Sequence, residues 1–378
     1  MEAPVLARYP NALADVILRE ASVKEKISLI IPSYNERDNI KPLIERVDKA
    51  LAGCDHEILI LDDNSTDGTI EAAEDMAGKY PVRVIVRREE KGLATAVVHG
   101  MRHACGEIIG VMDADLQHPP EVLPSLVKAM EDGADMVFGS RYIPGGGCPH
   151  WGMLRKVISR VASMMCHLLL PATRRVKDPM SGLFMFRRDR VDPDKLKPIG
   201  YKIALEIMLI GDFRKVIEAP YIFEDRSAGA SKLKAATQIE YIKHLLSLMS
   251  RTGELAMFVK FVIVGLSGVI VNQGFLWLLT DYGGMEYYIS ALIGIEASII
   301  TNFILNDFFT FATRRTGKTF LGRLLKFNLI CLSGAGIQYG LLRLFTDVFG
   351  VYYLVSNIIG ILVAFIWNYF VNRHWTWK

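Results

Sequence analysis

Four long apolar segments in the last third of the chain limit its fold more than any other feature of the sequence. They lie at about residues 258–280, 288–306, 324–346 and 353–371. A helix needs roughly 20 apolar residues to cross the ~30 Å hydrocarbon core of a bilayer, and each segment approaches that length. Backbone N–H and C=O groups cannot stay unpaired in lipid. We therefore expect a transmembrane domain of four helices over residues 258–378.

The four segments form two copies of one helix pair, related by an offset of 66 residues (326 − 260). Lys260 and Asn302 in the first copy correspond to Lys326 and Asn368 in the second. The same offset joins further first-copy positions to identical residues, namely Phe261, Leu266, Ser267, Gly268, Thr280, Asp281, Ile293, Gly294, Ile295 and Asn306. A gapless match of this length indicates a duplication. Because each copy crosses the membrane twice, both copies share one orientation.

Basic residues are concentrated at one end of these helices. The join between the copies contains Arg314, Arg315 and Lys318. The turns within the copies, which we expect at 281–286 and around 347, are taken to contain no Lys or Arg. By the positive-inside rule, we expect an integral, multi-pass protein with four transmembrane helices. Its join, its C-terminus and its N-terminal domain would lie on the cytoplasmic side.

The first 250 residues differ in composition from the rest of the chain. They contain 34 Lys and Arg and 35 Asp and Glu (44 − 10 and 41 − 6), against 10 and 6 in the remaining 128 residues. This balance is typical of a soluble α/β enzyme. The net charge of only +3 gives no general basic field, so we expect no nucleic-acid partner.

Short apolar runs alternate with amphipathic helical segments through the first part of the chain, which predicts a mostly parallel sheet with covering helices. The expected strands are 27–31, 57–61, 82–86, 107–112 and 134–138. Acidic residues follow three of these strands, at Glu36, Asp63 and Asp113. Ligands of open α/β sheets bind outside the carboxyl ends of the strands. We therefore expect these residues to meet at one binding site.

Asp113, Asp115 and Gln117 directly follow a buried strand. In extended backbone, residues at i, i+2 and i+4 lie on one face. Three oxygen donors in this arrangement suit Mg²⁺ or Mn²⁺ shared with a diphosphate, although a solvated acidic turn is the alternative for the motif taken alone. The chain has neither G-x-G-x-x-G after its first strand nor G-x-x-x-x-G-K-[ST] anywhere. A bound nucleotide is therefore not held by a glycine cradle, and the acidic strand ends are expected to bind base and ribose.

Several motifs occur in the order found in glycosyltransferase family 2, whose catalytic domain has the Rossmann-like GT-A fold. They are Ile31-Pro-Ser-Tyr-Asn-Glu36, Asp62-Asp-Asn-Ser-Thr-Asp-Gly-Thr69, Lys91-Gly92, Asp113-Ala-Asp115-Leu-Gln-His-Pro119, Gly139-Ser-Arg-Tyr142, Asp178-Pro-Met-Ser-Gly182 and Arg226-Ser-Ala-Gly-Ala-Ser-Lys-Leu233. The chain resembles in particular the polyprenyl-phosphate branch of this family, which includes the dolichyl-phosphate mannose synthases. This resemblance covers about residues 27–235, and residues 258–378 resemble the small GtrA-type four-helix membrane domain.

The resemblance implies roles for individual residues. Asp113, Asp115 and Gln117 would bind the metal and, with Arg141, carry catalysis. The nucleotide sugar would be bound by Pro32, Tyr34, Glu36, Asp63, Asp113, Ala114, Asp115, Gln117, Arg226 and Lys232. The last two lie, in this branch, on a loop that closes over the diphosphate. The residues that we assign to the acceptor phosphate are Arg141, Arg155 and Ser159, because arginine forms strong charge-assisted bonds to phosphate.

The implied reaction transfers mannose from GDP-mannose to dolichyl or another polyprenyl phosphate at the cytoplasmic face of the bilayer. It would depend on Mg²⁺ or Mn²⁺ and invert the anomeric centre to a β-linked product. A phosphate monoester is largely anionic at pH 7, so this acceptor needs no general base. Three alternatives stay open: a UDP-glucose donor, a processive polysaccharide synthase with Glu206 as its base, and a lipid-sugar flippase with a degenerate enzyme domain.

Two amphipathic segments are predicted to lie in the membrane interface, because each combines an apolar face with flanking cations. The first, at 150–170, has an apolar stripe that includes Trp151 with Arg155 beside it. The second, within 234–257, has His244 among its flanking cations. Packing on the sheet is the alternative for either one. We thus divide the chain into an N-terminal extension (1–26), a GT-A domain (27–233), the second interfacial segment and the membrane domain.

Glu296 lies in the middle of the second apolar segment, and its equivalent in the other copy is Leu362. An ionisable side chain at membrane depth is a functional candidate. We favour a neutral, hydrogen-bonded packing role.

Overall fold

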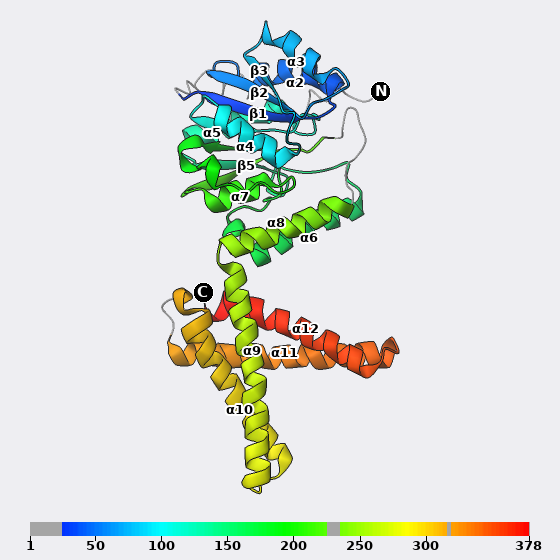
Figure 1. Cartoon of the computed structure of the whole chain (residues 1–378), viewed down its shortest axis with the longest axis vertical. Coiled ribbons are helices and arrows are strands. Elements are labelled where there is room, and N and C mark those ends of the chain that lie inside the picture. The colour runs from blue at the N-terminus through cyan, green and yellow to red at the C-terminus, as the bar shows by residue number, and fades with distance from the viewer. Residues whose placement is uncertain (1–24, 225–234, 316–318, 378) are drawn as a thin grey trace. The chain divides into compact units, whose positions relative to one another are not determined.

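The computed structural model of the chain describes residues 25–224, 235–315 and 319–377. The chain divides into two compact units, Met1–Met249 and Ser250–Lys378, and each is considered by itself (Figure 1). All but the last two residues of the N-terminal extension lie outside the described residues.

A seven-stranded sheet in the order β3-β2-β1-β4-β6-β5-β7 forms the centre of the first unit. Strands β1 to β4 pair in parallel, β6 runs antiparallel to β4 and β5, and β7 is parallel to β5. The strands are β1 Ile27–Ser33, β2 His56–Asp62, β3 Val82–Val86, β4 Ile108–Val111, β5 Met136–Ser140, β6 Phe184–Arg187 and β7 Val216–Pro220. The predicted α/β architecture with a mostly parallel sheet is confirmed.

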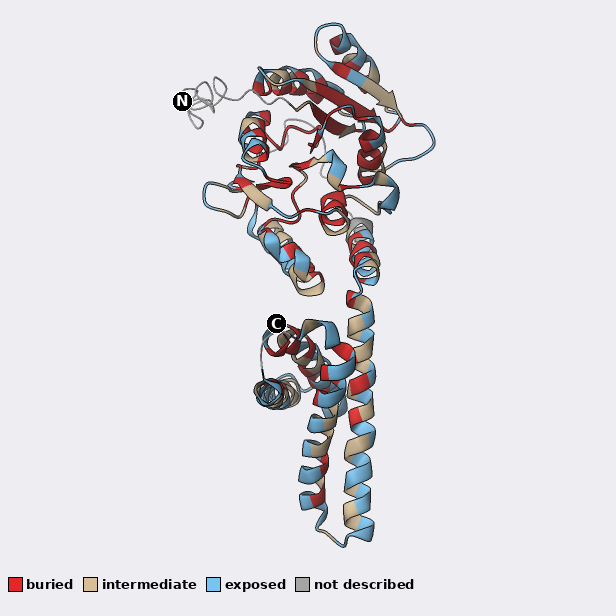
Figure 2. Cartoon of the chain, turned by 90° about the vertical axis from the view of Figure 1, so that its left-hand side faces the viewer, coloured by how far each residue is buried: buried red, intermediate tan, exposed pale blue. Residues whose placement is uncertain are grey.

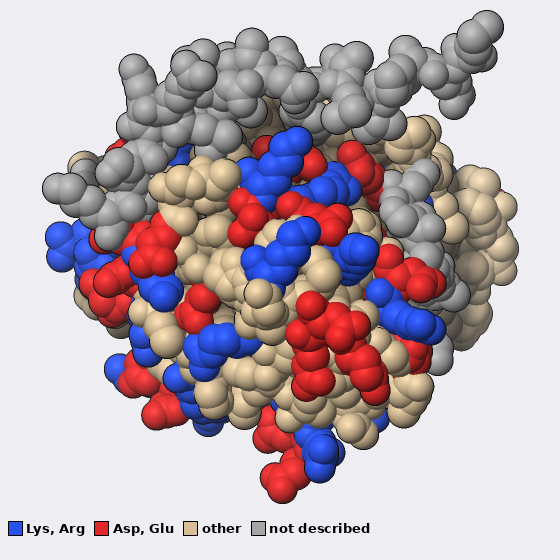
Figure 3. Space-filling model, turned by 90° about the horizontal axis from the view of Figure 1, so that it is seen from above, with Lys and Arg blue, Asp and Glu red and all other residues tan. Residues whose placement is uncertain are grey.

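Amphipathic helices pack on this sheet, and most residues of its strands are buried (Figure 2). Helix α2, for example, buries Ile40, Leu43 and Val47 at the three- and four-residue spacing of one helix face. The helices of the first unit are α2 Arg37–Ala50, α3 Thr69–Ala77, α4 Leu93–His103, α5 Leu123–Glu131, α6 Met153–Leu169, α7 Ile203–Ile210 and α8 Ala235–Arg251. Basic and acidic side chains are interspersed over the face seen in Figure 3.

Helices α6 and α8 are the two predicted amphipathic segments, and they pack together: the Tyr241 hydroxyl donates to the Ala162 carbonyl at 2.9 Å. Both helices leave large apolar side chains exposed. On α6 these are Met153, Leu154, Val157, Ile158, Val161 and Met164, and on α8 they are Ile239, Ile242 and Leu246. Two details of the prediction are wrong. Trp151 precedes α6 and is buried, and His244 is buried beside Glu206 instead of flanking the apolar face.

The second unit contains four helices that are long and apolar enough to cross a membrane, as predicted. They are α9 Glu254–Trp277, α10 Tyr287–Leu305, α11 Phe320–Arg343 and α12 Tyr353–Val371, and each continues into a short π-helical turn. Figure 1 shows α9 beside α10 and α11 beside α12. Most of their positions are exposed or half-buried, in contrast to the sheet (Figure 2).

The two copies repeat their packing as well as their sequence. A Cβ built on Gly268 would meet the Asn302 amide, and one built on Gly334 would meet the Asn368 amide in the same way. Likewise, Lys260 lies over the Phe309 ring, and its equivalent Lys326 lies over the Trp375 ring. The predicted duplication is therefore confirmed in the contacts between helices.

Charged residues pair at both ends of the helices. Near the join, Arg323 binds the buried Asp307 carboxylate through two bonds of 2.8 and 3.0 Å. At the opposite end, Arg343 binds Asp347 at 2.5 Å. We expected no basic residue around position 347. This expectation is wrong, because Arg343 lies one helical turn before it. In mid-helix, Glu296 accepts a bond from the Asn328 amide at 3.0 Å, which agrees with the hydrogen-bonded role predicted for it.

Candidate active site

A pocket of about 950 Å³ opens at the carboxyl ends of β1, β2, β4 and β5. Its lining includes every described residue for which a binding role was predicted: Pro32, Tyr34, Glu36, Asp63, Asp113, Ala114, Asp115, Gln117, Arg141, Arg155 and Ser159. Arg226 and Lys232 lie outside the described residues. The structure therefore brings the predicted donor and acceptor residues into one cavity, while the role of each stays a prediction.

The acidic motif after β4 does not continue the strand. Leu116, between Asp115 and Gln117, has φ +60°, and the Gln117 N–H donates to the Asp115 carboxylate at 3.1 Å. The motif is therefore a tight turn, and the expectation that strand alternation aligns the three side chains is wrong. All three nevertheless line the pocket, because the turn folds them toward the end of the sheet.

The three oxygen donors Asp113, Asp115 and Gln117 fit a divalent cation that also binds a diphosphate. Among the described residues, no three His, Cys, Asp or Glu side chains gather at metal-binding spacing. The motif supplies two carboxylates and one amide. The Gln117 amide nitrogen donates to the Glu224 carbonyl at 3.4 Å, so its amide oxygen remains as the acceptor. Mg²⁺ typically takes one or two carboxylates and completes its shell with substrate phosphates and water.

Gly182 and the buried His118 lie next to the Asp113 carboxylate. A Cβ on Gly182 would lie 2.8 Å from Asp113 Oδ2 and 3.2 Å from His118 Cε1. His118 packs against the Tyr221 and Phe223 rings at 5.4 Å, and its Nδ1 lies 3.6 Å from Asp113 Oδ2. Burial lowers the pKa of His118 to about 4, so the imidazole is neutral at pH 7.

Asp63, at the end of β2, positions the loop before α4. Its carboxylate accepts from Arg87 at 2.9 Å and from the Gly92 N–H at 2.6 Å. Burial raises the pKa of Asp63 above its ordinary value, although both bonds act in the opposite direction. Gly92 has φ +126°, a conformation that favours glycine. Asp63 thus fixes the Lys91-Gly92 segment as well as lining the pocket.

The end of β1 contributes an exposed aromatic ring and a carboxylate. Tyr34 is 40% exposed, and Lys91 Nζ lies 5.2 Å from its ring centroid. Glu36 accepts from the Asn39 amide at 2.7 Å, and its N–H donates to the Thr69 hydroxyl. An exposed ring beside a carboxylate suits stacking on a base and bonding to a ribose hydroxyl.

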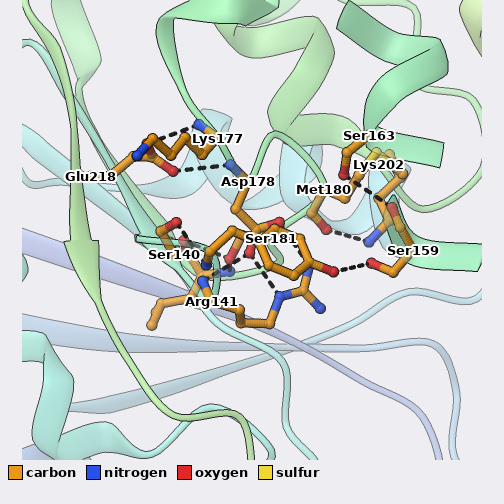
Figure 4. A network of polar contacts seen from close by, with 12 residues as sticks. Ser140, Arg141, Ser159, Ser163, Lys177, Asp178, Met180, Ser181, Lys202 and Glu218 are labelled. Atoms are coloured by element: carbon orange, nitrogen blue, oxygen red, sulfur yellow. Dashed lines mark hydrogen bonds and ion pairs between the residues drawn. The ribbon is translucent and has the colours of Figure 1, made fainter. Parts of the chain in front are cut away.

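Arg141 and Asp178 form a buried ion pair at the opposite side of the pocket (Figure 4). The guanidinium donates through Nε and Nη2 at 2.7 and 2.8 Å, and the Arg141 N–H donates to the same carboxylate at 3.0 Å. Burial alone would lower the pKa of Arg141, but the bonds to Asp178 outweigh it and raise that pKa. Asp178 is itself held by Glu218, which accepts its N–H at 3.0 Å.

Trp151 connects the two arginines of the predicted acceptor site. The guanidinium carbon of Arg155 lies 4.1 Å from a Trp151 ring centroid, and that of Arg141 lies 5.1 Å from it. Cation–π contacts of this kind are strongest on tryptophan. Ser159 accepts a bond from the Tyr142 hydroxyl at 2.7 Å, one helical turn after Arg155 (Figure 4). Arg141 and Arg155 thus place two cations side by side at the Trp151 ring, next to the start of α6.

Lys202 is a pocket residue that the sequence analysis did not identify. Its Nζ donates to the Met180 carbonyl at 2.6 Å (Figure 4). Burial, and next the charge of Arg141, lowers the pKa of Lys202 to about 8. The nearby carboxylates Asp113 and Asp178 act in the opposite direction. Lys202 thus brings a cation between the acidic motif and the arginines.

Asp178 and Gly182 were also missed as site residues, although both belong to a motif that carried the family resemblance. A motif match marks such residues without saying which atoms they touch. Trp151 was placed on the apolar stripe, because nothing in a single sequence separates a tryptophan that faces lipid from one that stacks on arginines.

Two parts of this chain match models of known protein families. Residues 28–194 match the model of glycosyl transferase family 2, and residues 260–377 match that of the GtrA/DPMS transmembrane domain. A dolichol-phosphate mannosyltransferase of Pyrococcus furiosus is 46% identical over 352 residues, covering 93% of this chain and 99% of that protein. One from Saccharomyces cerevisiae is 40% identical, covering 58% of this chain and 86% of the yeast protein. Among solved structures, glucosyl-3-phosphoglycerate synthase from Mycobacterium tuberculosis in complex with phosphoglyceric acid aligns with a TM-score of 0.49 and 19% sequence identity. The alignment covers 65% of this chain and 85% of that one.

Proposed function

This chain belongs to the dolichol-phosphate mannosyltransferases, a group of family 2 glycosyltransferases, and we propose that it transfers mannose from GDP-mannose to dolichyl or another polyprenyl phosphate. The observation that carries the proposal is that one pocket is lined both by the acidic motif at Asp113 and by Arg141 and Arg155. The two ends suit a nucleotide sugar and a lipid phosphate respectively. Mannosyl transfer and the dolichyl phosphate acceptor are proposed from the names of the relatives. The choice of GDP-mannose as the donor goes one step further.

On the donor side, we infer that Pro32, Tyr34, Glu36 and Asp63 bind base and ribose. Asp113, Asp115 and Gln117 would hold Mg²⁺ or Mn²⁺, and Ala114 would lie against the diphosphate. The cation would neutralise charge on the departing nucleoside diphosphate. Arg226 and Lys232 are proposed to bind the same diphosphate.

On the acceptor side, Arg141, Arg155 and Ser159 are proposed to bind the lipid phosphate and aim one of its oxygens at the anomeric carbon. In-line attack by that oxygen forms the new C–O bond as the bond to the diphosphate breaks, with inversion. The phosphate is already anionic near pH 7, so no side chain has to remove a proton. Fixed guanidinium groups contribute by positioning and by electrostatic stabilisation.

The position of Glu206 argues against the alternative of a polysaccharide synthase. Its side chain is fully buried in α7, its Oε1 accepts the Lys197 N–H at 2.5 Å, and its Oε2 lies 3.6 Å from His244. It is not among the described residues that line the pocket. Glu206 is therefore not placed to act as the base that this alternative assigns to it.

The acceptor also requires a membrane location for the site. We infer that α6 and α8 lie in the interface, because their exposed apolar side chains would otherwise face water. Helix α8 ends at Arg251 and α9 begins at Glu254, so the chain enters the proposed bilayer directly after α8. The basic join between the helix pairs suggests that this side is cytoplasmic.

The test is a transfer assay with the purified full chain, Mg²⁺ or Mn²⁺, polyprenyl phosphate and a panel of labelled nucleotide sugars. We expect label in lipid from GDP-mannose, loss of transfer with a chelator, and loss in Asp113→Asn. Asp75→Asn, on the exposed face of α3, is the control and should retain the wild-type rate. Label from UDP-glucose instead would replace the donor, and transfer that survives both the chelator and Asp113→Asn would refute the metal site.

A further inference from the structure

A second cavity, of about 820 Å³, borders helix α6 on the side away from the active-site pocket. Five residues on one face of α6 line it, namely Arg160, Ser163, Met164, His167 and Leu168. The active-site pocket uses Arg155, Ile158, Ser159 and Ala162, which form another face. None of the roles assigned above uses the second cavity, apart from Arg141 in its wall.

Three exposed cations, Arg160, Arg174 and Lys177, line this second cavity. No acidic side chain is among the described residues that line this cavity. Arg141 is neutralised by its own buried partner. Glu218 lies next to this segment and accepts the backbone N–H groups of Lys177 and of the following residue, at 2.8 and 3.0 Å.

His167 adds no charge to the second cavity. Its Nδ1 lies 3.0 Å from the Thr173 hydroxyl. Burial and the Arg174 charge lower the pKa of His167 below its ordinary value, so the ring stays neutral at pH 7. The cavity therefore keeps a net positive charge.

The apolar stripe of α6 separates the two cavities. Ile158, which is exposed, lines the active-site pocket, and Met164, also exposed, lines the second cavity. When the stripe rests on a bilayer, both cavities open at the level of the lipid headgroups. Arg155 borders the stripe on one side and Arg160 on the other, so each cavity offers cations at that level.

We propose that the second cavity binds the phosphate headgroup of an anionic membrane phospholipid, with Arg160, Arg174 and Lys177 around the phosphate and Met164 and Leu168 against the upper acyl chains. A small free anion would gain only contacts to exposed cations that water also reaches. A lipid adds apolar burial at the rim and enters from the bilayer on which α6 rests. This site would fix the catalytic domain in one orientation above the acceptor.

The experiment measures binding of a short-chain anionic lipid, dioctanoyl phosphatidylglycerol, to the purified full chain in neutral detergent by calorimetry and native mass spectrometry. The triple variant Arg160→Gln, Arg174→Gln, Lys177→Gln removes three cations that would attract an anionic headgroup. It should weaken binding at this site about tenfold or more and retain one phosphatidylglycerol fewer per chain than wild type. Dioctanoyl phosphatidylcholine should bind wild type and the triple variant equally.

The matched control removes three exposed cations from other parts of the same unit: Lys41→Gln, Lys79→Gln, Lys128→Gln. It should bind phosphatidylglycerol like wild type. Unchanged binding in the first triple variant, or an equal loss in the control, would overturn the proposal. Displacement of the lipid by equimolar inorganic phosphate would overturn it in favour of a free-anion site. If the triple variant does not fold, Lys177→Glu alone should lower the affinity.

This proposal is independent of the sugar that is transferred, because its assay contains no nucleotide sugar. In neutral detergent the triple variant should transfer sugar at the wild-type rate. A failed lipid-binding result therefore leaves the proposed reaction intact, and a failed transfer assay leaves this site intact.

Discussion

Replacing Gly182 with alanine tests how closely the Asp113 carboxylate must be positioned. The new Cβ would lie 2.8 Å from Asp113 Oδ2 and 3.2 Å from His118 Cε1. His118 is buried beside the Tyr221 and Phe223 rings. The side chain of Asp113 is 32% exposed, so this carboxylate is the group that shifts.

The size of the shift follows from ordinary contact distances. Separations under 3.4 Å are tighter than nine in ten real Cβ contacts, so the carboxylate has to move by about 0.6 Å (3.4 − 2.8). A misplacement of about 1 Å in an active site can cost roughly a hundredfold in rate. We therefore expect kcat/KM to fall about tenfold or more, which corresponds to roughly 1.4 kcal/mol of lost transition-state stabilisation. Stability should change by less than about 1 kcal/mol, because the carboxylate that moves is partly exposed to solvent.

The assay compares initial rates of transfer to polyprenyl phosphate and the metal concentration that gives half of the maximal rate, for wild type and Gly182→Ala. Gly78→Ala is the control, because a Cβ there meets nothing within 4 Å. We expect a lower rate and a higher metal requirement in Gly182→Ala alone, with thermal unfolding close to wild type in both. A wild-type rate in Gly182→Ala would refute the idea that the Asp113 carboxylate must occupy this position.

Three further predictions concern other parts of the chain. Asp178→Asn leaves the Arg141 guanidinium buried without a counter-charge. The free energy of unfolding, measured with denaturant, should fall by about 3–5 kcal/mol. A fall of less than about 1 kcal/mol would contradict a stabilising role of the ion pair. Lys202 is protonated below its pKa of about 8 and loses its charge above it. The kcat/KM of wild type should therefore fall as pH rises through 8, and Lys202→Met should lack this fall. Identical pH profiles of kcat/KM for the two proteins would exclude Lys202 from the mechanism. Gly268→Ala and Gly334→Ala each press on an asparagine amide of the neighbouring helix and should lower the melting temperature by similar amounts, whereas clearly unequal effects would contradict the equivalence of the two copies.

The features that the sequence predicts well depend on neighbours along the chain. Strand β3 occupies the predicted residues 82–86, and β1 and β2 begin within one residue of their predicted starts. Apolar runs of these lengths bury themselves in any sheet of this type. The membrane helices follow for the same reason, and the offset of 66 residues reappears in contacts such as Lys326 over Trp375.

The features that the sequence does not predict depend on distant partners. Strand β6, from Phe184 to Arg187, enters the sheet antiparallel between β4 and β5, and no local pattern specifies that direction. Leu116 adopts a left-handed conformation that its residue type disfavours, because the turn is held by bonds such as Gln117 to Glu224. His244 was predicted to be one of the cations that flank the apolar face of its helix, whereas Glu206 from another helix lies beside it in the interior.

The two arginines of the acceptor site are held in different ways, and this difference suits a lipid phosphate. Arg141 uses Nε and Nη2 on Asp178, and a guanidinium has five N–H donors, so its Nη1 hydrogens remain for a ligand in a fixed direction. The guanidinium carbon of Arg155 lies 4.1 Å from a Trp151 ring centroid, and a cation–π contact is less directional than a two-bond ion pair. A phosphate on a long lipid arrives in variable poses, so one rigid donor can set the line of attack while the other adjusts. Arg155→Lys should therefore raise KM for the acceptor more than it lowers kcat, because lysine offers no planar face for Trp151.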